Sequence, residues 1–463
     1  MSDPAPIPLA VDFSVKSANG VRAELVNCYV DVDEKAREVH VTKRPGTTLH
    51  QAHPTGTPLG LFVWKTDLYA VIDSTVYKNG VALTGSVNTA GGFYSFASGL
   101  GPSPKLFLHN RTNGYVIDGA GTLTAITDVD FPPNQTPARP IVPGAVYLNG
   151  VFYVMDEKSE FANSDATTGD DPAVWEAFTL AAEFDGDEVV AIAKQLVYVL
   201  VFKKYSIEAF ADLGNSVGVP LSAVGSAKLV YGLREARTLV DCGGELFFVS
   251  QTREGGACVV RLASLAPVIV SNAAVDIFLD QTFGGQIYGW SARVKGHRFY
   301  GLTAPAKATT LVYDITAGVW YRWSGAGAAY FPYVFSSAGP DAQALLMHET
   351  SGDVDRLDPN ASADLGTAFL AQITTPPVTQ ELRTAIGGRL DVLADKATGA
   401  QLTIEFFDND SAIASASQTV DLGLDRPSIA DLGSFFRRQF RLSTTSILPF
   451  RAQKLILYTD AGT

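Results

Sequence analysis

One two-part pattern recurs seven times along the chain: a short β-rich run, a turn, and a second run that often ends in Asp, Asn or Gly. The seven first runs are Leu68–Val71, Lys105–His109, Val151–Met155, Val197–Phe202, Leu246–Ser250, Arg298–Leu302 and Ala344–His348. The second runs include Val76–Gly80, Tyr115–Gly119, Ser206–Phe210, Cys258–Leu262 and Leu311–Ile315. Successive units begin about 40 to 50 residues apart, which is the period of a four-stranded propeller blade. Because such a unit must stack against neighbours to bury its faces, the pattern predicts a ring of sheets.

The composition agrees with a chain made of many short strands joined by tight turns. Aromatic residues make up 10% of the 463 residues and charged residues only 18%, and the chain has 42 Gly and 24 Pro. Such a profile is typical of all-β proteins. We therefore predict an all-β fold: a β-propeller of about seven blades, with an N-terminal extended arm and a C-terminal β-sandwich-like domain.

The domain boundaries follow changes in the pattern. Residues 1–58 hold two strand-like stretches in an otherwise irregular segment, and we predict them to be the arm. Residues 59–370 hold the repeats of the propeller. After Thr374–Pro377 the alternation of apolar and polar residues continues without the repeat, so residues 381–463 are predicted to be a separate sandwich that folds independently.

The charge and the cysteines narrow the class of protein. A formal net charge of −13 at pH 7 argues against a protein that clamps nucleic acid by neutralising phosphates.

The spacing of the cysteines argues against a disulfide. A hairpin turn at Thr252–Gly255 would place Cys258 opposite Val249 and away from Cys242. With Cys28 far from both in the sequence, we expect free thiols in a reducing cytoplasm.

No segment suggests a membrane span or a signal peptide. Val189–Phe202 is the most apolar stretch, but Lys194 interrupts it. Residues Met1–Pro6 have neither a basic start nor an apolar run. We therefore expect synthesis in the cytoplasm and no stable membrane insertion.

Sequence motifs of enzymes and metal sites are sparse. The sequence contains no phosphate-binding glycine loop, His-Glu-x-x-His pair or Gly-x-Ser-x-Gly elbow. His50 and His53 have metal-ligand spacing, but they lie in a connector that is also typical of a solvated loop.

The acidic segment Asp165–Asp171 has two interpretations. It could hold calcium, or it could simply form a polar turn, since it lacks the alternation of an EF-hand loop. Asp171–Phe178 predicts a short helical turn capped by Asp171. We predict no catalytic, cofactor-binding or metal-binding residues.

One motif invites an enzymatic interpretation. Ser362–Phe369 matches the Ser-x-Asp-x-Gly-x-x-aromatic pattern of the Asp box found in sialidase propellers. That motif stabilises a hairpin in a blade and is not catalytic. A sialidase would also need a group of arginines and a Tyr nucleophile beside a carboxylate, and the order of residues marks no such group. We therefore predict a protein that is not an enzyme.

The arm carries the sharpest resemblance to a known family. Asn27–Asp33 followed by Thr42–Gly46 resembles the opening of the packaged-DNA stabilisation proteins, which are tail hub or nozzle proteins of short-tailed bacteriophages. Seven further motifs follow the order of that family: Leu68–Tyr77, Ile126–Phe131, Leu148–Val154, Ser206–Asn215, Gly296–Tyr300, Thr310–Trp320 and Val354–Asp358. The loop around Asp165 and the chain beyond Gln380 match it only loosely.

The resemblance implies a role as well as a fold. It implies a β-propeller subunit of a homo-oligomeric, six-fold ring below the portal and its adaptor, located in the virion tail. Such a ring retains packaged DNA, lets viral DNA pass through its lumen without sequence preference, and offers docking sites to tail fibres or tail-tip proteins. The family implies no catalytic residues and no cofactor. The residues alone leave two alternatives: a generic ligand- or glycan-binding propeller, and a sialidase-like glycosidase.

Overall fold

The computed structural model describes residues 5–15, 20–33, 38–168, 170–182, 186–214, 218–282, 284–379 and 385–461. Strands dominate these residues, which confirms the predicted all-β class. The described residues include one α-helix, α1 (Ala273–Gln281), and four 3₁₀ turns: η1 (Pro132–Asn134), η2 (Ala166–Thr168), η3 (Ala236–Thr238) and η4 (Pro305–Lys307). In this part of the chain no helix is long and apolar enough to cross a membrane.

The sequence analysis did not predict α1. The helix begins at Asn272, whose side-chain oxygen accepts hydrogen bonds from the backbone N–H groups of Ala274 and Val275. An Asn in this position is a common helix start, and two Ala residues, which have the highest helix propensity, follow it. Its short length made it easy to mistake for part of the connection between two repeats.

Sheet pairing groups the described strands of residues 46–358 into seven successive antiparallel units. The first three are β6 (Pro58–Trp64), β7 (Asp67–Ile72), β8 (Thr75–Lys78), β9 (Val81–Ala82); β10 (Ser95–Ser98), β11 (Leu106–His109), β12 (Gly114–Ile117), β13 (Leu123–Ala125); and β14 (Val146–Leu148), β15 (Val151–Met155), β16 (Glu160–Asn163), β17 (Leu180–Ala181). The next two are β18 (Val189–Gln195), β19 (Tyr198–Lys203), β20 (Ile207–Asp212), β21 (Leu221–Leu229); and β22 (Gly232–Leu233), β23 (Val240–Asp241), β24 (Leu246–Gln251), β25 (Ala257–Ala263), β26 (Ala266–Ile269). The last two are β27 (Tyr288–Val294), β28 (His297–Ala304), β29 (Thr309–Asp314), β30 (Val319–Trp323); and β31 (Tyr333–Ala338), β32 (Ala344–His348), β33 (Val354–Asp358), β5 (Gly46–Gln51).

The repeats read from the sequence fall on the two middle strands of these units. Each first run lies on the second strand of its unit, as Leu68–Val71 lies on β7, and the second runs lie on the third strands, as Leu311–Ile315 overlaps β29. In the fifth unit β22 and β23 share the first position, because both pair with β24. Middle strands are covered on both faces by neighbouring units, so their residues are apolar and easy to recognise. Val199, Leu200 and Val201 of β19, for example, are all fully buried.

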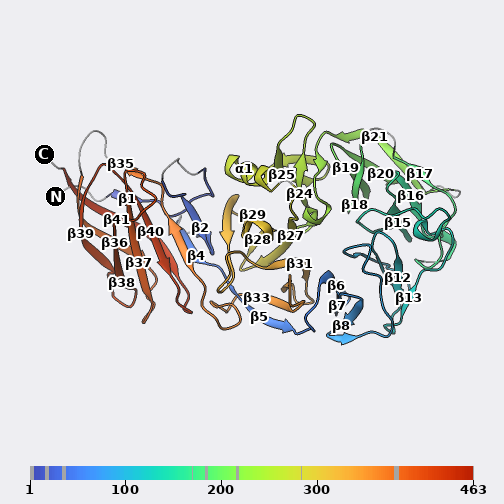
Figure 1. Cartoon of the computed structure of the whole chain (residues 1–463), viewed down its shortest axis with the longest axis horizontal. Coiled ribbons are helices and arrows are strands. Elements are labelled where there is room, and N and C mark those ends of the chain that lie inside the picture. The colour runs from blue at the N-terminus through green and yellow to red at the C-terminus, as the bar shows by residue number, and fades with distance from the viewer. Residues whose placement is uncertain are drawn as a thin grey trace.

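The units are arranged in a closed ring. Each unit contacts the unit that follows: β6 contacts β10, β10 contacts β14, β14 contacts β18, β19 contacts β22, β23 contacts β27, and β27 contacts β31. β31 then contacts β6 again. Figure 1 shows this ring on the right, with the C-terminal strands on the left. A closed ring leaves no unit with an unpaired face.

The outer strand of the seventh unit comes from the N-terminal part of the chain. β5 pairs with β33, with Thr48 opposite Arg356 and Thr47 opposite Leu357. Gly46 starts β5 where a Cβ atom would lie only 2.0 Å from the Ala363 carbonyl oxygen, so a side chain does not fit there. The ring is therefore closed by a strand that lies about 300 residues before its partner in the sequence.

The remaining strands form two further layers. One sheet contains β1 (Ala5–Ile7), β3 (Cys28–Asp33), β4 (Glu38–Lys43), β36 (Ala385–Ala394), β39 (Ser428–Phe435) and β41 (Arg451–Ala461). The other contains β2 (Glu24–Val26), β34 (Ala371–Thr374), β35 (Val378–Thr379), β37 (Gln401–Asp408), β38 (Ala416–Asp421) and β40 (Arg437–Thr444), and it continues through β2 into β30 of the sixth unit. Side chains of both sheets share one apolar core, with Leu390 and Leu457 from the first sheet and Ile404 and Leu442 from the second.

The N-terminal residues are thus distributed over the whole molecule. β1 and β4 pair with β41, β2 lies between β30 and β34, and β5 completes the seventh unit. The boundaries at residues 58, 370 and 381 stay predictions, but the described strands on either side of them share sheets and a core.

The register of one hairpin differs from the prediction by one residue. Cys258 pairs with Ser250, not with Val249, because the connection between β24 and β25 is one residue longer than the predicted turn.

Cys28, Cys242 and Cys258 are free thiols. Burial raises the pKa of Cys28 to about 12 and that of Cys258 to about 11.

Candidate functional site

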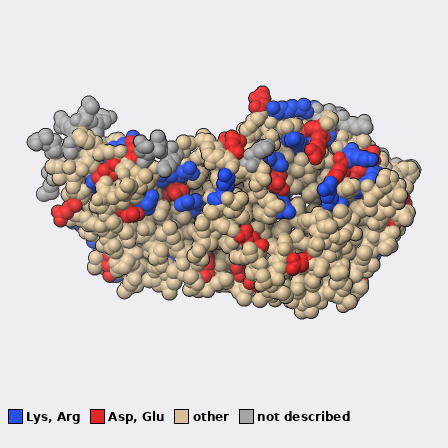
Figure 2. All heavy atoms as spheres, in the orientation of Figure 1, with Lys and Arg blue, Asp and Glu red and all other residues tan. Residues whose placement is uncertain are grey.

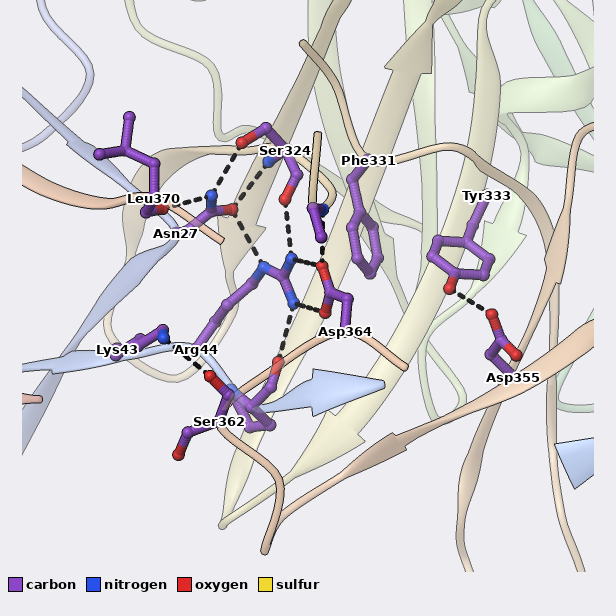
Figure 3. A network of polar contacts seen from close by, with 12 residues as sticks. Asn27, Lys43, Arg44, Ser324, Phe331, Tyr333, Asp355, Ser362, Asp364 and Leu370 are labelled. Atoms are coloured by element: carbon purple, nitrogen blue, oxygen red, sulfur yellow. Dashed lines mark hydrogen bonds and ion pairs between the residues drawn. The ribbon is translucent and has the colours of Figure 1, made fainter. Parts of the chain in front are cut away.

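Two motifs that stand far apart in the sequence meet at one buried ion pair. Arg44, from the Thr42–Gly46 motif, forms a bidentate pair with Asp364 of the Asp-box match, with N···O distances of 2.9 and 2.6 Å. The Arg44 side chain is 0% exposed and that of Asp364 10%. Figure 3 shows how this pair joins the N-terminal segment, the end of the sixth unit and the chain that follows the ring.

All five N–H donors of the Arg44 guanidinium have acceptors. Besides Asp364, these are the Asn27 side-chain oxygen and the backbone carbonyls of Pro45 and Ser324. The guanidinium also lies between two aromatic rings, 4.6 Å from the centroid of Phe331 and 3.8 Å from that of Phe369. Such complete pairing is what makes a buried cation tolerable.

The neighbours of Arg44 extend the network. Asn27 has a positive φ of 53°, a conformation that Asn tolerates better than most residues. Its side-chain amide donates to Ser324 Oγ and to the Leu370 carbonyl. Lys43 donates to the carbonyls of Ser362 and Ser446, 2.7 and 2.6 Å away. Burial lowers the pKa of Lys43 to about 8, and the positive charge of Arg44 acts in the same direction. The cluster therefore fixes the N-terminal segment to both halves of the molecule.

This geometry gives the Asp-box match a structural role. Asp364 and Thr367 form a tight hairpin by exchanging two backbone hydrogen bonds, while both carboxylate oxygens of Asp364 are bound by Arg44. A carboxylate held in this way is not free for acid–base chemistry. Phe369, the aromatic residue of the motif, supplies a ring face to Arg44 and Lys43.

A second buried polar pair lies in the seventh unit. Tyr333 of β31 donates its hydroxyl to Asp355 of β33 at 2.5 Å, and the other carboxylate oxygen of Asp355 has no hydrogen-bond partner among the described residues. Burial raises the pKa of Asp355 to about 6, although the hydrogen bond from Tyr333 opposes this shift. The closing unit of the ring thus contains a titratable group (Figure 3).

The other candidates from the sequence are not brought together. His53 packs edge-on against Tyr77, with ring centroids 5.2 Å apart, and its burial lowers its pKa. Asp165 accepts hydrogen bonds from the backbone and side chain of Thr167 in a tight turn. Asp171 pairs with Lys105 at 2.6 Å and caps a hydrogen-bonded turn rather than a helix. Within the described ranges, no group of His, Cys, Asp and Glu could hold a metal ion.

The middle of the ring contains a cavity of about 740 Å³. Its lining comes from the first strands and adjoining loops of the first, second, fifth, sixth and seventh units. Arg237 of η3 lies at this cavity, with its guanidinium carbon 5.1 Å from the ring centroid of Phe93 and 5.0 Å from that of Tyr288. Since these rings belong to the second and sixth units, side chains from three units meet here.

The size of this cavity limits what it can hold. A volume of about 740 Å³ is that of a small-ligand pocket. A DNA duplex is far wider, because its major groove alone admits an α-helix with a diameter of about 10 to 12 Å. A duplex is therefore too large for this cavity.

A family model described as "Bacteriophage P22 Gp10, beta-propeller" matches residues 25–325, which is well over half of the chain. The chain belongs to this phage stabilisation family. The match begins in β2 and ends just after β30, so it spans the N-terminal strands and the first six sheet units. It confirms the predicted propeller and the predicted family.

Other comparisons are weaker. A search of curated proteins finds no match. A solved S. cerevisiae assembly of Dbp5 with Nup159, Gle1, IP6 and ADP is similar at 10% identity and a TM-score of 0.41, over 72% of this chain and 98% of that one. PorZ of Porphyromonas gingivalis is similar at 11% identity and a TM-score of 0.39, over 74% of this chain and 44% of that one. The family assignment therefore rests on the family match.

Proposed function

We propose that the protein is a structural subunit of the tail of a short-tailed phage. In this proposal several copies, most simply six, form a ring below the portal and its adaptor in the virion. The ring retains the packaged DNA and forms the channel through which the genome is ejected. Membership of the phage stabilisation family is the observation that carries the proposal.

The cavity inside one propeller supports a lumen built between copies. A duplex is too large for the cavity of about 740 Å³, and this supports a DNA path beside the propellers, along the axis of the oligomer. A closed ring of identical subunits uses a heterologous interface, in which one face of a subunit meets a different face of the next. The lumen is then lined by one outer surface from each copy.

The charge of the chain suits a wall past which DNA slides. A net charge of −13 does not favour tight binding of phosphates. Figure 2 shows that, on the face in view, Lys and Arg alternate with Asp and Glu, and much of the lower part carries few charges. Mixed signs produce no broad positive field that would hold a polyanion.

We further propose that the two ends of the ring contact different tail components: the portal–adaptor complex on one side and tail fibres or tail-tip proteins on the other. The network around Arg44 supports a rigid subunit, because it fixes the N-terminal segment to the seventh unit and to the C-terminal sheets. A rigid subunit presents preformed surfaces to neighbours that arrive in order. No catalytic step is part of this role.

The test uses phage particles that lack the protein. A nonsense mutation in its gene, grown in a non-suppressing host, should give heads that package DNA and then release it, measured as DNase-sensitive genome after filling. Supplying the wild-type chain in trans, or adding purified protein to filled heads, should restore retention. Particles without the chain that keep their genomes and carry complete tails would falsify the proposal.

A further inference from the structure

The cavity in the middle of the propeller has a chemical character that the proposed role does not use. Its apolar lining includes four aromatic side chains from the first, second and seventh units: Phe62, Phe93, Phe96 and Phe335. Two of them, Phe62 and Phe96, stack with ring centroids 5.4 Å apart and an interplanar angle of 8°. Stacked rings of this kind offer flat apolar faces to a planar group.

The charged residues of the cavity are mainly basic. Arg237, Arg293 and Arg298 line it, and Asp241 is the one acidic residue among its described lining residues. The cavity therefore has an excess of two positive charges in a chain whose net charge is −13. A concave, partly apolar site with this local excess attracts anions, since field lines concentrate in such a cleft.

Arg237 is held in position without a carboxylate partner. It packs against the rings of Phe93 and Tyr288 and donates one hydrogen bond to Tyr288 Oη at 2.9 Å. Within the described part of the chain, no Asp or Glu forms an ion pair with it, in contrast to the bidentate pairing of Arg44. A guanidinium fixed by aromatic faces keeps several donors for a bidentate acceptor.

We propose that this cavity binds an aromatic or apolar group that carries a single anionic head. The head pairs with the free donors of Arg237, and the apolar part packs against the rings that line the cavity. The volume of about 740 Å³ lies in the range of small-ligand pockets and excludes a nucleic acid duplex. Such a ligand is either a free small acid or the C-terminal residue of a peptide, whose carboxylate and apolar side chain offer the same chemistry.

The first experiment measures binding of 8-anilinonaphthalene-1-sulfonate, an aromatic sulfonate, to the purified full-length protein by fluorescence. We expect saturable binding with one site per chain. Loss of the charge-assisted contact in Arg237→Gln should weaken it about tenfold or more. The matched control is Arg253→Gln, since Arg253 also packs on a tyrosine ring (5.7 Å from Tyr205) but does not line the cavity; its affinity should be unchanged. Equal affinity of the wild type and Arg237→Gln would overturn the proposal.

A second experiment needs no variant, so it is informative even where Arg237→Gln fails to fold. Wild-type protein loaded with the fluorophore is titrated with 1-naphthoate and with the neutral 1-naphthamide, then with acetyl-Gly-Phe as the free acid and as the amide. Displacement by either acid, with its neutral counterpart at least about tenfold weaker, supports the proposal and identifies the source of the ligand. Displacement by neither acid, or equally by the neutral compounds, contradicts it. The assay uses the isolated chain, so its outcome does not depend on assembly into a tail.

Discussion

The propeller and the C-terminal layers are built from similar strands, but their partners lie at very different distances in the sequence. The fourth sheet unit is complete within residues 189–229. In the C-terminal layers, by contrast, Ala5 pairs with Leu457 and Val41 pairs with Ala452. Local pairing costs little loop entropy, whereas distant pairing requires most of the chain to be in place.

This difference in sequence separation predicts where a single substitution disturbs the fold most. A blade such as the fourth unit can be disturbed at a turn without involving distant parts of the chain, because its strands are consecutive. The junction around Arg44 joins segments near residues 27, 44, 324 and 364, so one substitution there affects several sheets.

Removing the C-terminal strands should disrupt more than the C-terminal layers. A chain that ends at Thr379 lacks β41, which pairs with β1 and β4, and β40, which pairs with β34. It also exposes Ile373, because the core residues Leu402 and Leu442 are removed. We expect insoluble protein or loss of the β-sheet circular dichroism spectrum. This reverses the independent folding expected from the sequence alone.

The matched control changes a local turn in the propeller. Inserting Gly-Ser-Gly after Ala120, in the exposed turn between β12 and β13, should be tolerated, with a soluble product and a wild-type spectrum. A truncated chain that is as soluble and as well folded as this insertion variant would show that the C-terminal layers are an independent domain.

Breaking the central ion pair should be the most costly single substitution among those considered. Arg44→Ala leaves the Asp364 carboxylate without its cation in a buried site, which costs about 3 to 5 kcal/mol in the free energy of unfolding. Urea denaturation at pH 7 measures the loss.

Two variants sharpen that result. Lys396→Ala removes an ion pair between exposed side chains, Lys396 (58% exposed) and Asp425 (93% exposed), and should leave the free energy of unfolding nearly unchanged. The double variant Arg44→Met with Asp364→Leu should recover part of the loss, because no unpaired charge remains. Similar costs for Arg44→Ala and Lys396→Ala would mean that the buried network does not stabilise the junction.

The closing unit of the ring should respond to pH through Asp355. Its pKa is raised to about 6, whereas a free Asp has a pKa of about 3.9, so the folded state binds the proton more tightly. The associated stabilisation is complete below about pH 4 and is lost as the pH rises through about 6. From pH 4.5 to 7.5, wild-type stability should therefore fall relative to Asp355→Asn, by about 2 kcal/mol.

Tyr333→Phe serves as the comparison for this pH effect. The hydrogen bond from Tyr333 lowers the pKa of Asp355, so its removal should move the loss of stability to higher pH. Parallel stability curves for the wild type, Asp355→Asn and Tyr333→Phe over this pH range would rule out a role for Asp355 in the pH response.

A smaller pH effect is expected where the sixth unit meets β3. Burial alone would lower the pKa of His297, but the hydrogen bond to Asp314 (2.7 Å) and the charges of Asp314 and Asp31 together raise it. The stabilisation is present below the ordinary pKa of histidine and is lost as the pH rises through the raised value. His297→Gln should therefore reduce the free energy of unfolding more at pH 5.5 than at pH 8.5. An equal loss at both values would contradict this.

The same contrast explains what could be predicted from the sequence. The middle strands of the units were recognisable because successive residues such as Phe247 and Phe248, which lie on opposite faces of the sheet, are both buried. The short strands at the inner and outer edges, such as β9 and β22, are too short to produce a periodic pattern. Local composition is enough to identify the strands, but it does not indicate which distant strands they pair with.

The candidate site shows this limit more sharply. Arg44 and Asp364 each belonged to a motif noted in the sequence, yet nothing local indicates that they form a pair across 320 residues. The cavity was also beyond prediction, because Phe93, Arg237 and Tyr288 come from three units and meet only when the ring closes. Such sites depend on tertiary closure rather than on spacing along the chain.

We propose that copies of this chain surround the DNA path and that the DNA does not run through a propeller. A cryo-EM reconstruction of DNA-filled particles, focused on the tail, would distinguish these two paths. We expect several propellers around a common axis, with duplex density on that axis and none inside any propeller cavity. Duplex density through the middle of a propeller, or a tail without this chain, would show that the proposed arrangement is wrong.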